Sequence, residues 1–421
     1  MAHASVTRRS VGLAFAAAGM VLFSTTGGSA AEPPPWRIGA IFPFTGNLAV
    51  LGNEAATAAE IAVDIVNEKG GVLGRKVKII RGDGVDPQKS ANEAKRLITQ
   101  EKVDLLTGTY GSANAMAIAA VANREHAMYW ELAAVAEDLT KQGYKYVFRT
   151  NENTRFMANS MVDVIPDVLA AKLGKKPADL KIALLHEESV FGTSIAKAVQ
   201  DRVTEKGMKI AETIPYNSAS IDLSPMVLKM KELNPDVLLV VQYVNDSVLF
   251  WKQAKENGYA PKIIIAAGTG QSSPNFVKAV GDSAADGVFV SDAFWMSTTG
   301  LKPEAAALQN EIIKRYKAKM GKHPTYALKF AISMYFLLTD VIPKAGSFNP
   351  DAIRKAAMSI DLPMGSLPLG YGIKYDAGGQ NTHSLMIIFQ YQKGAQPIVV
   401  WPKQMADGQL IMVPLPAWDK R

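Results

Sequence analysis

A regular alternation of short apolar runs with longer amphipathic stretches limits the fold of this chain most strongly. Between residues 37 and 291, apolar runs such as 77–80 and 237–243 alternate with stretches such as 54–67, whose apolar residues recur at helical spacing. Runs this short favour buried strands, and the spacing favours helices. Strand and helix in this order indicate parallel sheets with helices on both faces. The sequence therefore predicts an α/β fold.

The pattern also predicts more than one domain. A chain of 421 residues is long enough for two or three cores. The predicted strands exceed one comfortable sheet, so we divide it near residue 151. After residue 291 two long helical stretches follow, 303–320 and 327–342, and we expect them to return to the first sheet. We therefore predict two doubly wound parallel-sheet lobes. Lobe 1 comprises residues 37–150 and 292–366, and lobe 2 comprises residues 151–291 and 367–421.

Residues 1–31 are typical of an export signal. Arg8 and Arg9 precede an apolar run at 11–23, and small residues at 28–31 suit cleavage. The arginine pair also allows the twin-arginine route. The chain has no cysteine, which excludes disulfides and a lipid anchor at the cleavage site. No other stretch is long and charge-free enough to span a bilayer. We expect a freely diffusing, monomeric periplasmic protein.

Residues 105–117, LLTGTYGSANAMA, are the first candidate site. An apolar run at 103–107 meets two glycines, and an alanine-rich helical pattern follows. This order places Tyr110, Gly111 and Ser112 at the carboxyl end of a strand, where ligand crevices of open α/β sheets lie. The N–H groups of the helix start favour an anionic or polar ligand group. A plain strand-to-helix turn with Ser112 as N-cap explains the same residues.

Aromatic and acidic residues at other predicted strand ends or loops are further candidates. Phe44 and Phe191 lie in loops, where a phenylalanine needs a partner. Glu131 ends a predicted strand, and a surface salt bridge with Arg124 or Arg149 is its alternative explanation.

Several function classes find no support. The net charge is +7 without a long basic run, so nucleic acid is not an expected partner. The chain has no HExxH, GxSxG, P-loop or strand-linked GxGxxG motif, and its five histidines show no zinc spacing. We expect neither an enzyme nor a bound metal or cofactor.

Several segments together resemble one protein family. They are IGAIFPFTGNLAVLG, NEKGGVLGRKVKII, GDGVDPQKSANEAKRLI, VDLLTGTYGSANA and HEESVFGTSIAKAVQD. Residues 37–400 resemble the periplasmic solute-binding proteins of the leucine/isoleucine/valine-binding type, which serve ABC importers. The resemblance implies the type I periplasmic binding fold, with two doubly wound lobes joined by three crossovers and closing on a ligand by hinge motion. It also implies a small-molecule solute and permease subunits in the inner membrane as partners. A periplasmic ligand sensor of the same fold is the alternative.

The resemblance also assigns residues to the ligand. Ser112 stands where the family's serine binds the ligand carboxylate. Ala133 and Ala134 match the alanine pair whose backbone groups contribute.

Three positions depart from the family's amino-acid binders. Val135 replaces a threonine, Phe191 replaces a tyrosine, and Gln271 or its neighbour Gly270 lies where the glutamate that pairs with the ligand ammonium is expected. A buried ammonium without a carboxylate is costly. We therefore expect a solute with a carboxylate or amide end. Glu131 or Asp246 could supply the missing charge from another direction.

Overall fold

The computed structural model describes residues 1–5, 32–293, 295, 297–298 and 300–421. Apart from residues 1–5, the predicted export signal lies outside the described residues. The chain divides into two units, Met1–Pro33 and Pro34–Arg421, and the second contains all the helices and strands described below.

The first sheet has five parallel strands in the order β2-β1-β3-β4-β5. Its strands are β1 Trp36–Phe42, β2 Val77–Asp83, β3 Leu105–Gly108, β4 Tyr129–Glu131 and β5 Val147–Arg149. Three helices connect the early strands: α1 Ala49–Glu68, α2 Pro87–Thr99 and α3 Ser112–Arg124. The alternation in the sequence therefore produces the expected parallel sheet.

The second sheet has seven strands in the order β14-β13-β10-β9-β8-β6-β7. Its strands are β6 Ile182–Glu187, β7 Ile210–Tyr216, β8 Val237–Val241, β9 Ile264–Ala267, β10 Phe289–Asp292, β13 Ile387–Gln392 and β14 Gln396–Trp401. Strands β6 to β10 pair in parallel, whereas β13 and β14 add an antiparallel edge. Its helices are α4 Thr154–Val164, α5 Ala170–Lys172, α6 Val190–Glu205, α7 Ser224–Leu233, α8 Val244–Glu256, α9 Pro274–Val280 and α10 Asp282–Ala285.

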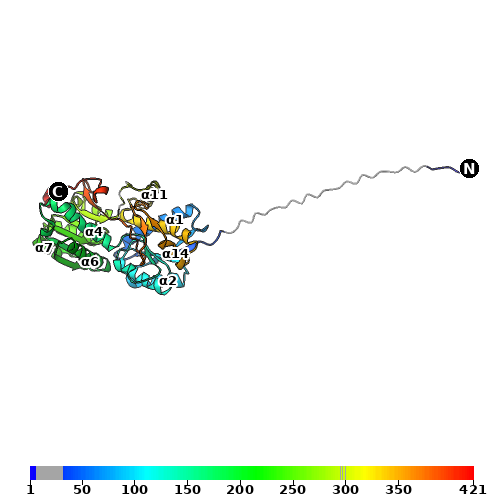
Figure 1. The fold of residues 1–421 in the computed structure, drawn as a ribbon, viewed down its shortest axis with the longest axis horizontal. Helices are drawn as coiled ribbons and strands as arrows, with labels where there is room; N and C mark the ends of the chain where they lie inside the picture. Colours follow the sequence, from blue (N-terminus) through cyan, green and yellow to red (C-terminus); the bar gives the residue numbers. More distant parts are fainter. Residues whose placement is uncertain (6–31, 294, 296, 299) are drawn as a thin grey trace. The chain divides into compact units, whose positions relative to one another are not determined.

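Later helices return to the first sheet. They are α11 Pro303–Met320, α12 Leu328–Phe336, α13 Ile342–Ala345 and α14 Pro350–Met358, and both α11 and α12 pack against α1. Figure 1 shows α1, α2, α11 and α14 in one group and α4, α6 and α7 in another. A two-stranded sheet, β11 Asp361–Leu362 with β12 Ile373–Lys374, follows. Short 3₁₀ turns lie at Glu137–Thr140, Pro177–Asp179, Thr325–Ala327, Lys403–Met405 and Trp418–Lys420.

Two helical stretches contain a π-helical turn. The stretch from α4 to α5 has a π turn at Ile165–Leu169, and the stretch predicted as a helix over 327–342 has a π turn at Leu337–Val341. Pro166 lies in the first turn and Pro343 follows the second. Proline has no N–H to donate to the α-helical ladder, so the local backbone rearranges around it.

The chain passes from the first sheet to the second after β5, returns after β10 and passes again before β13. The prediction put residues 367–421 entirely in lobe 2. In the structure, the Arg149 N–H donates to the Gly379 carbonyl at 2.9 Å, and Tyr375 contacts Trp130 of the first sheet. The segment before β13 therefore lies beside the first sheet. We propose a third lobe boundary later than residue 367.

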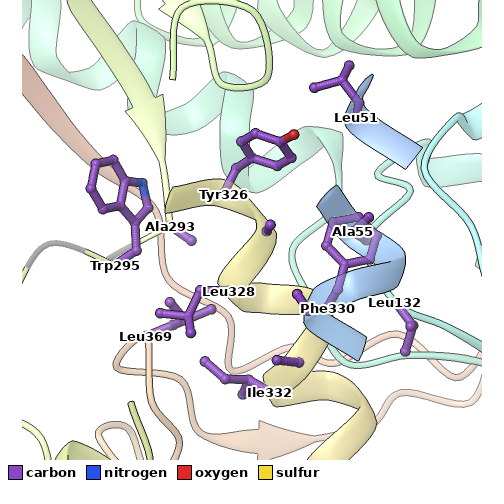
Figure 2. Packing of buried hydrophobic residues seen from close by; sticks show 14 of the residues in the cluster. Leu51, Ala55, Leu132, Ala293, Trp295, Tyr326, Leu328, Phe330, Ile332 and Leu369 are labelled. Atoms are coloured by element: carbon purple, nitrogen blue, oxygen red, sulfur yellow. The ribbon is translucent and has the colours of Figure 1, made fainter. Parts of the chain in front are cut away.

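Helix α12 lies at the centre of the hydrophobic core that adjoins the candidate ligand-binding site. Figure 2 shows its Phe330 beside Ala55 of α1, and both belong to one buried cluster with Leu51, Leu328 and Ile332. Among the described residues, Thr325–Ala345 is the one helical stretch that is long and apolar enough to span a membrane. The prediction that no stretch outside the export signal meets this criterion is therefore wrong. In its apolar 18-residue window, 83% is buried inside the protein, which is typical of a core helix.

Candidate ligand-binding site

A small enclosed cavity of about 20 Å³ lies where loops from both sheets meet. Most of its lining follows the carboxyl ends of parallel strands, where α/β folds bind ligands. The first sheet contributes loops after β3 and β4, the second contributes loops and helix starts, and α12 contributes one residue. The lining residues are Tyr110, Ala133, Val135, Met157, Phe191, Tyr243, Thr269 and Lys329. Four of them, Tyr110, Ala133, Val135 and Phe191, are predicted from the sequence.

Aromatic rings form two walls of this cavity. Tyr110 stacks on Phe330 with ring centroids 5.8 Å apart and meets the edge of Tyr326. Phe191 packs against Tyr243 at 5.1 Å. Burial raises the pKa of Tyr110 well above its usual value, although a hydrogen bond with Thr269 acts in the opposite direction. The Tyr110 hydroxyl therefore stays protonated and joins the loops of the two sheets.

Lys329 brings a positive charge to the cavity. Its side chain is almost buried, and Nζ donates to Oε1 of the completely buried Glu152 at 2.7 Å. The Tyr371 hydroxyl donates to the other oxygen, Oε2, at 2.6 Å. Burial alone would raise the pKa of Glu152, but the charge and hydrogen bond of Lys329, with help from Tyr371, lower it.

The ammonium group of Lys329 has N–H donors beyond the one that Glu152 uses. A lysine ammonium carries three N–H bonds, and Glu152 accepts from one of them. None of the described residues that line the cavity is an acid. The chemistry of the lining therefore suits an anionic group attached to an apolar body, because small-molecule sites usually combine a few polar groups with a mostly apolar surface.

Ser112 does not line the cavity. Helix α3 begins at Ser112 with Gly111 as its N-cap, so the expected capping role of Ser112 is wrong. Ser112 Oγ accepts a hydrogen bond from the Ala136 N–H at 3.2 Å, and the side chain is 2% exposed. Its hydroxyl therefore ties the loop after β4 to the start of α3. The ligand contact implied by the resemblance stays a prediction.

Glu131 organises the loops behind the cavity. Its Oε1 accepts from the N–H groups of Ala133 and Ala134 at 2.8 and 2.6 Å. Its Oε2 accepts from the Thr109 N–H and from the Tyr129 hydroxyl. Burial raises the pKa of Glu131 to about 7. The carboxyl group is fully buried, so the surface salt bridge considered from the sequence is wrong.

Three further candidates, Phe44, Gln271 and Ala134, lie outside the cavity lining. Phe44 packs against Phe42, with the Arg81 guanidinium 5.2 Å from its ring centre. Gln271 is 1% exposed and donates to Gln242 Oε1 at 2.8 Å. Ala134 is also buried, with its N–H bound to Glu131 as described above.

A larger groove of about 640 Å³ adjoins the cavity, and Tyr243 lines both. Loops near both sheets form it, and Gly111 and Asp246 are among its lining residues. Asp246 therefore faces this groove and is not among the cavity residues. Within the described ranges, no group of three His, Cys, Asp or Glu side chains is placed to hold a metal ion.

Four cavity residues were not predicted from the sequence: Met157, Tyr243, Thr269 and Lys329. Tyr243 stood at the end of the predicted strand 237–243, and Thr269 stood between two glycines, so both carried the positional signal that marked Tyr110. Lys329 carried a different signal. It is a charged residue inside a helix that is otherwise apolar enough to span a membrane, and such residues are seldom buried without a partner.

Two largely parallel sheets, each covered by helices, converge with their strand ends on one cavity. This arrangement defines the class of the type I periplasmic binding fold. The chain belongs to the periplasmic binding protein family, whose model matches residues 35–396. It is 36% identical to Leu/Ile/Val-binding protein homolog 8 of Brucella abortus, an alignment that covers 88% of this chain and 91% of the relative.

Solved structures share the fold. A branched-chain amino acid transporter substrate-binding protein from Streptococcus pneumoniae, in complex with isoleucine, has a TM-score of 0.71 at 23% identity, covering 87% of this chain and 100% of that one. An ABC transporter solute-binding protein from Rhodopseudomonas palustris, in complex with 3,4-dihydroxybenzoic acid, has a TM-score of 0.71 at 23% identity. That match covers 90% of this chain and 99% of the other.

Proposed function

We propose that this protein is the periplasmic solute-binding component of an ABC importer, capturing a small solute with a carboxylate or amide end and delivering it to the permease in the inner membrane. The observation that carries the proposal is Lys329, a buried ammonium group in the lining of a cavity whose described lining contains no acid. Tyr110, Phe191 and Tyr243 supply an apolar surface for the body of the solute.

The charge balance favours a carboxylate over an α-amino acid. A buried carboxylate gains a charge-assisted hydrogen bond from the ammonium group. The ammonium of an amino acid would instead lie in a cavity with a like charge and no acid among its described lining residues, which costs several kcal/mol. Glu152 already accepts from Lys329 and Tyr371, and Glu131 is bound by loop N–H groups. Neither is free to neutralise a ligand amine.

The family accommodates both kinds of solute. One structural neighbour was solved with isoleucine and another with 3,4-dihydroxybenzoic acid. The departures at Val135, Phe191 and Gln271 support the second kind for this chain, because all three lack an acid. The position of Lys329 supports it further.

We infer that the solute enters by opening of the lobes. A cavity of about 20 Å³ holds little more than one water molecule, so it cannot admit a carboxylate of several carbons as it stands. Hinge motion at the three crossovers would separate the Tyr110 loop from the Thr269 loop and close them again around the solute. The predicted export signal supports a cycle in the periplasm, after export by the general or the twin-arginine route, and we propose a monomer as the working unit.

Calorimetry with matched ligand pairs tests the proposal. Leucine is compared with 4-methylpentanoate and phenylalanine with 3-phenylpropanoate, since each pair differs in the amino group alone. We expect the des-amino carboxylate, or the corresponding amide, to bind at least as tightly as the amino acid. If both amino acids bind tenfold more tightly, the cavity holds a carboxylate for the amine, and an amino-acid importer replaces the proposal.

A further inference from the structure

The groove beside the cavity has an acidic lining. It is formed by segments from both sides of the cavity, including Asn47 and Gly111 near the first sheet and Ser220 and Asp246 near the second. Its described lining residues include two acids and no lysine, arginine or histidine. Because Tyr243 lines both spaces, a solute held in the cavity by one end can extend along this ring into the groove.

Asp246 is the buried acid of the groove. It lies in the first turn of α8 and is 2% exposed. Its Oδ2 accepts from the Tyr216 hydroxyl, whereas Oδ1 has no hydrogen-bond partner in the described part of the chain. A buried carboxylate oxygen without a partner costs free energy, and such groups call for an explanation. The other acid, Asp86, is exposed and caps α2.

No lysine, arginine or histidine among the described residues is shown to act on Asp246. The titratable groups that act on it are Tyr216 of β7, Glu187 of β6 and Tyr243 at the start of its own helix, while Asp86 lines the same groove. None of these carries a positive charge. Burial raises the pKa of Asp246 to about 7, although the hydrogen bond from Tyr216 and the electrostatic effect of nearby backbone N–H groups act in the opposite direction.

We propose that the groove is a second subsite in which Asp246 binds a hydrogen-bond-donating, preferably cationic, group at the far end of an elongated carboxylate solute. The inference rests on the proposed function, because the carboxylate end is held at Lys329. It narrows the substrate class from simple carboxylates to bifunctional ones, such as ω-amino carboxylates. The hydrogen-bond donor of the solute must be remote from its carboxylate, because the described lining of the cavity contains no acid that could pair with an amine.

The ionisation of Asp246 predicts proton release and a pH dependence of binding that an acid with only a structural role would not produce. A bound ammonium group favours the charged carboxylate, so binding of an ω-amino carboxylate near pH 7 releases part of a proton from Asp246. The advantage of the ω-amine over the plain carboxylate therefore grows as the pH rises through about 7. A plain carboxylate of the same length releases no proton from this residue.

Matched probes test the subsite on the full-length mature protein. Calorimetry compares hexanoate with ω-aminohexanoate, octanoate with ω-aminooctanoate, and para-methylbenzoate with para-(aminomethyl)benzoate, each in two buffers of different ionisation enthalpy. We expect at least one amine to bind tenfold or more tightly than its partner, with proton release. Asp246→Asn should abolish both the advantage and the proton release. Asp222→Asn makes the same charge change beside the groove at an exposed residue and should preserve them.

The outcomes separate the two proposals. If the plain carboxylates bind and no amine exceeds its partner in the natural protein, the subsite is overturned while the proposed function stands. This comparison needs no variant, so it holds even if Asp246→Asn fails to fold. An amine advantage that survives unchanged in Asp246→Asn also overturns the assignment. If none of these carboxylates or amines binds, both proposals fall.

Discussion

Replacing Lys329 with methionine separates its two roles, binding and folding. Methionine keeps most of the length of the side chain and removes the charge. For binding, the loss of a hydrogen bond between charged groups costs about 1.5–3 kcal/mol, which is roughly a tenfold to hundredfold weaker affinity. Calorimetry of Lys329→Met with 3-phenylpropanoate measures this loss. An unchanged affinity would refute the assignment of Lys329 to the solute carboxylate.

The same substitution should destabilise the fold, by an amount that depends on pH. Glu152 is completely buried, so removing its partner leaves a buried charge with only Tyr371 as a side-chain donor. Breaking a buried pair in this way costs about 3–5 kcal/mol. In the natural protein the pKa of Glu152 is lowered, so its contribution is present above the unfolded pKa of the glutamate and is lost as the pH falls through the folded one.

Without Lys329, burial dominates and the folded pKa of Glu152 rises above its usual value. Ionised Glu152 then opposes folding, so the cost of Lys329→Met should be larger at pH 8 than at pH 5. Denaturant unfolding followed by circular dichroism at both pH values measures it. The double variant Lys329→Met with Glu152→Gln removes the unpaired charge and should recover most of the stability. It should not recover carboxylate affinity, and recovery would show that Lys329 acts on binding only through the fold.

Three further predictions address the loops and the lobes. Ser112→Ala leaves the buried Ala136 N–H unpaired and should cost about 1–3 kcal/mol in denaturant unfolding. Calorimetry of the same variant tests the ligand contact implied by the resemblance, which an unchanged carboxylate affinity would contradict. Glu131 has a folded pKa of about 7, above its unfolded value, so the free energy of unfolding should fall as the pH rises from about 4.5 to 7. Glu131→Gln should remove that part of the slope in the same assay. A saturating carboxylate should reduce the radius of gyration in solution scattering, and identical curves would contradict hinge closure.

Much of the fold could be predicted because its determinants are local. Short apolar runs and helical spacing are written into neighbouring residues, and they indicated parallel α/β sheets correctly. The π turns at Ile165–Leu169 and Leu337–Val341 were missed because they reflect how the backbone accommodates a proline inside an otherwise regular helix. The antiparallel edge formed by β13 and β14 was missed because strand direction in a sheet depends on long-range pairing.

The location of the candidate site was predicted better than the hydrogen bonds and charges within it. Tyr110 and Phe191 line the cavity because strand ends converge there in this fold, which the sequence indicates. The directions of Ser112 and Glu131 were not predictable, because backbone N–H groups of the neighbouring loop decide them. Lys329 was missed because its partner Glu152 is 177 residues away in the sequence.

The buried pair of Lys329 and Glu152 is hard to explain by stability alone. Removing each charge from water costs several kcal/mol, and apolar residues of similar volume are often as stable or more stable than such a pair. Here the pair joins α12 to the segment after β5, and Tyr371 extends it toward the segment before β13. Both segments lie where the chain crosses between the sheets. Under the proposed function, a solute carboxylate that shares the ammonium group with Glu152 would act directly on the crossovers, and Lys329 would both select the solute and link its binding to closure of the lobes.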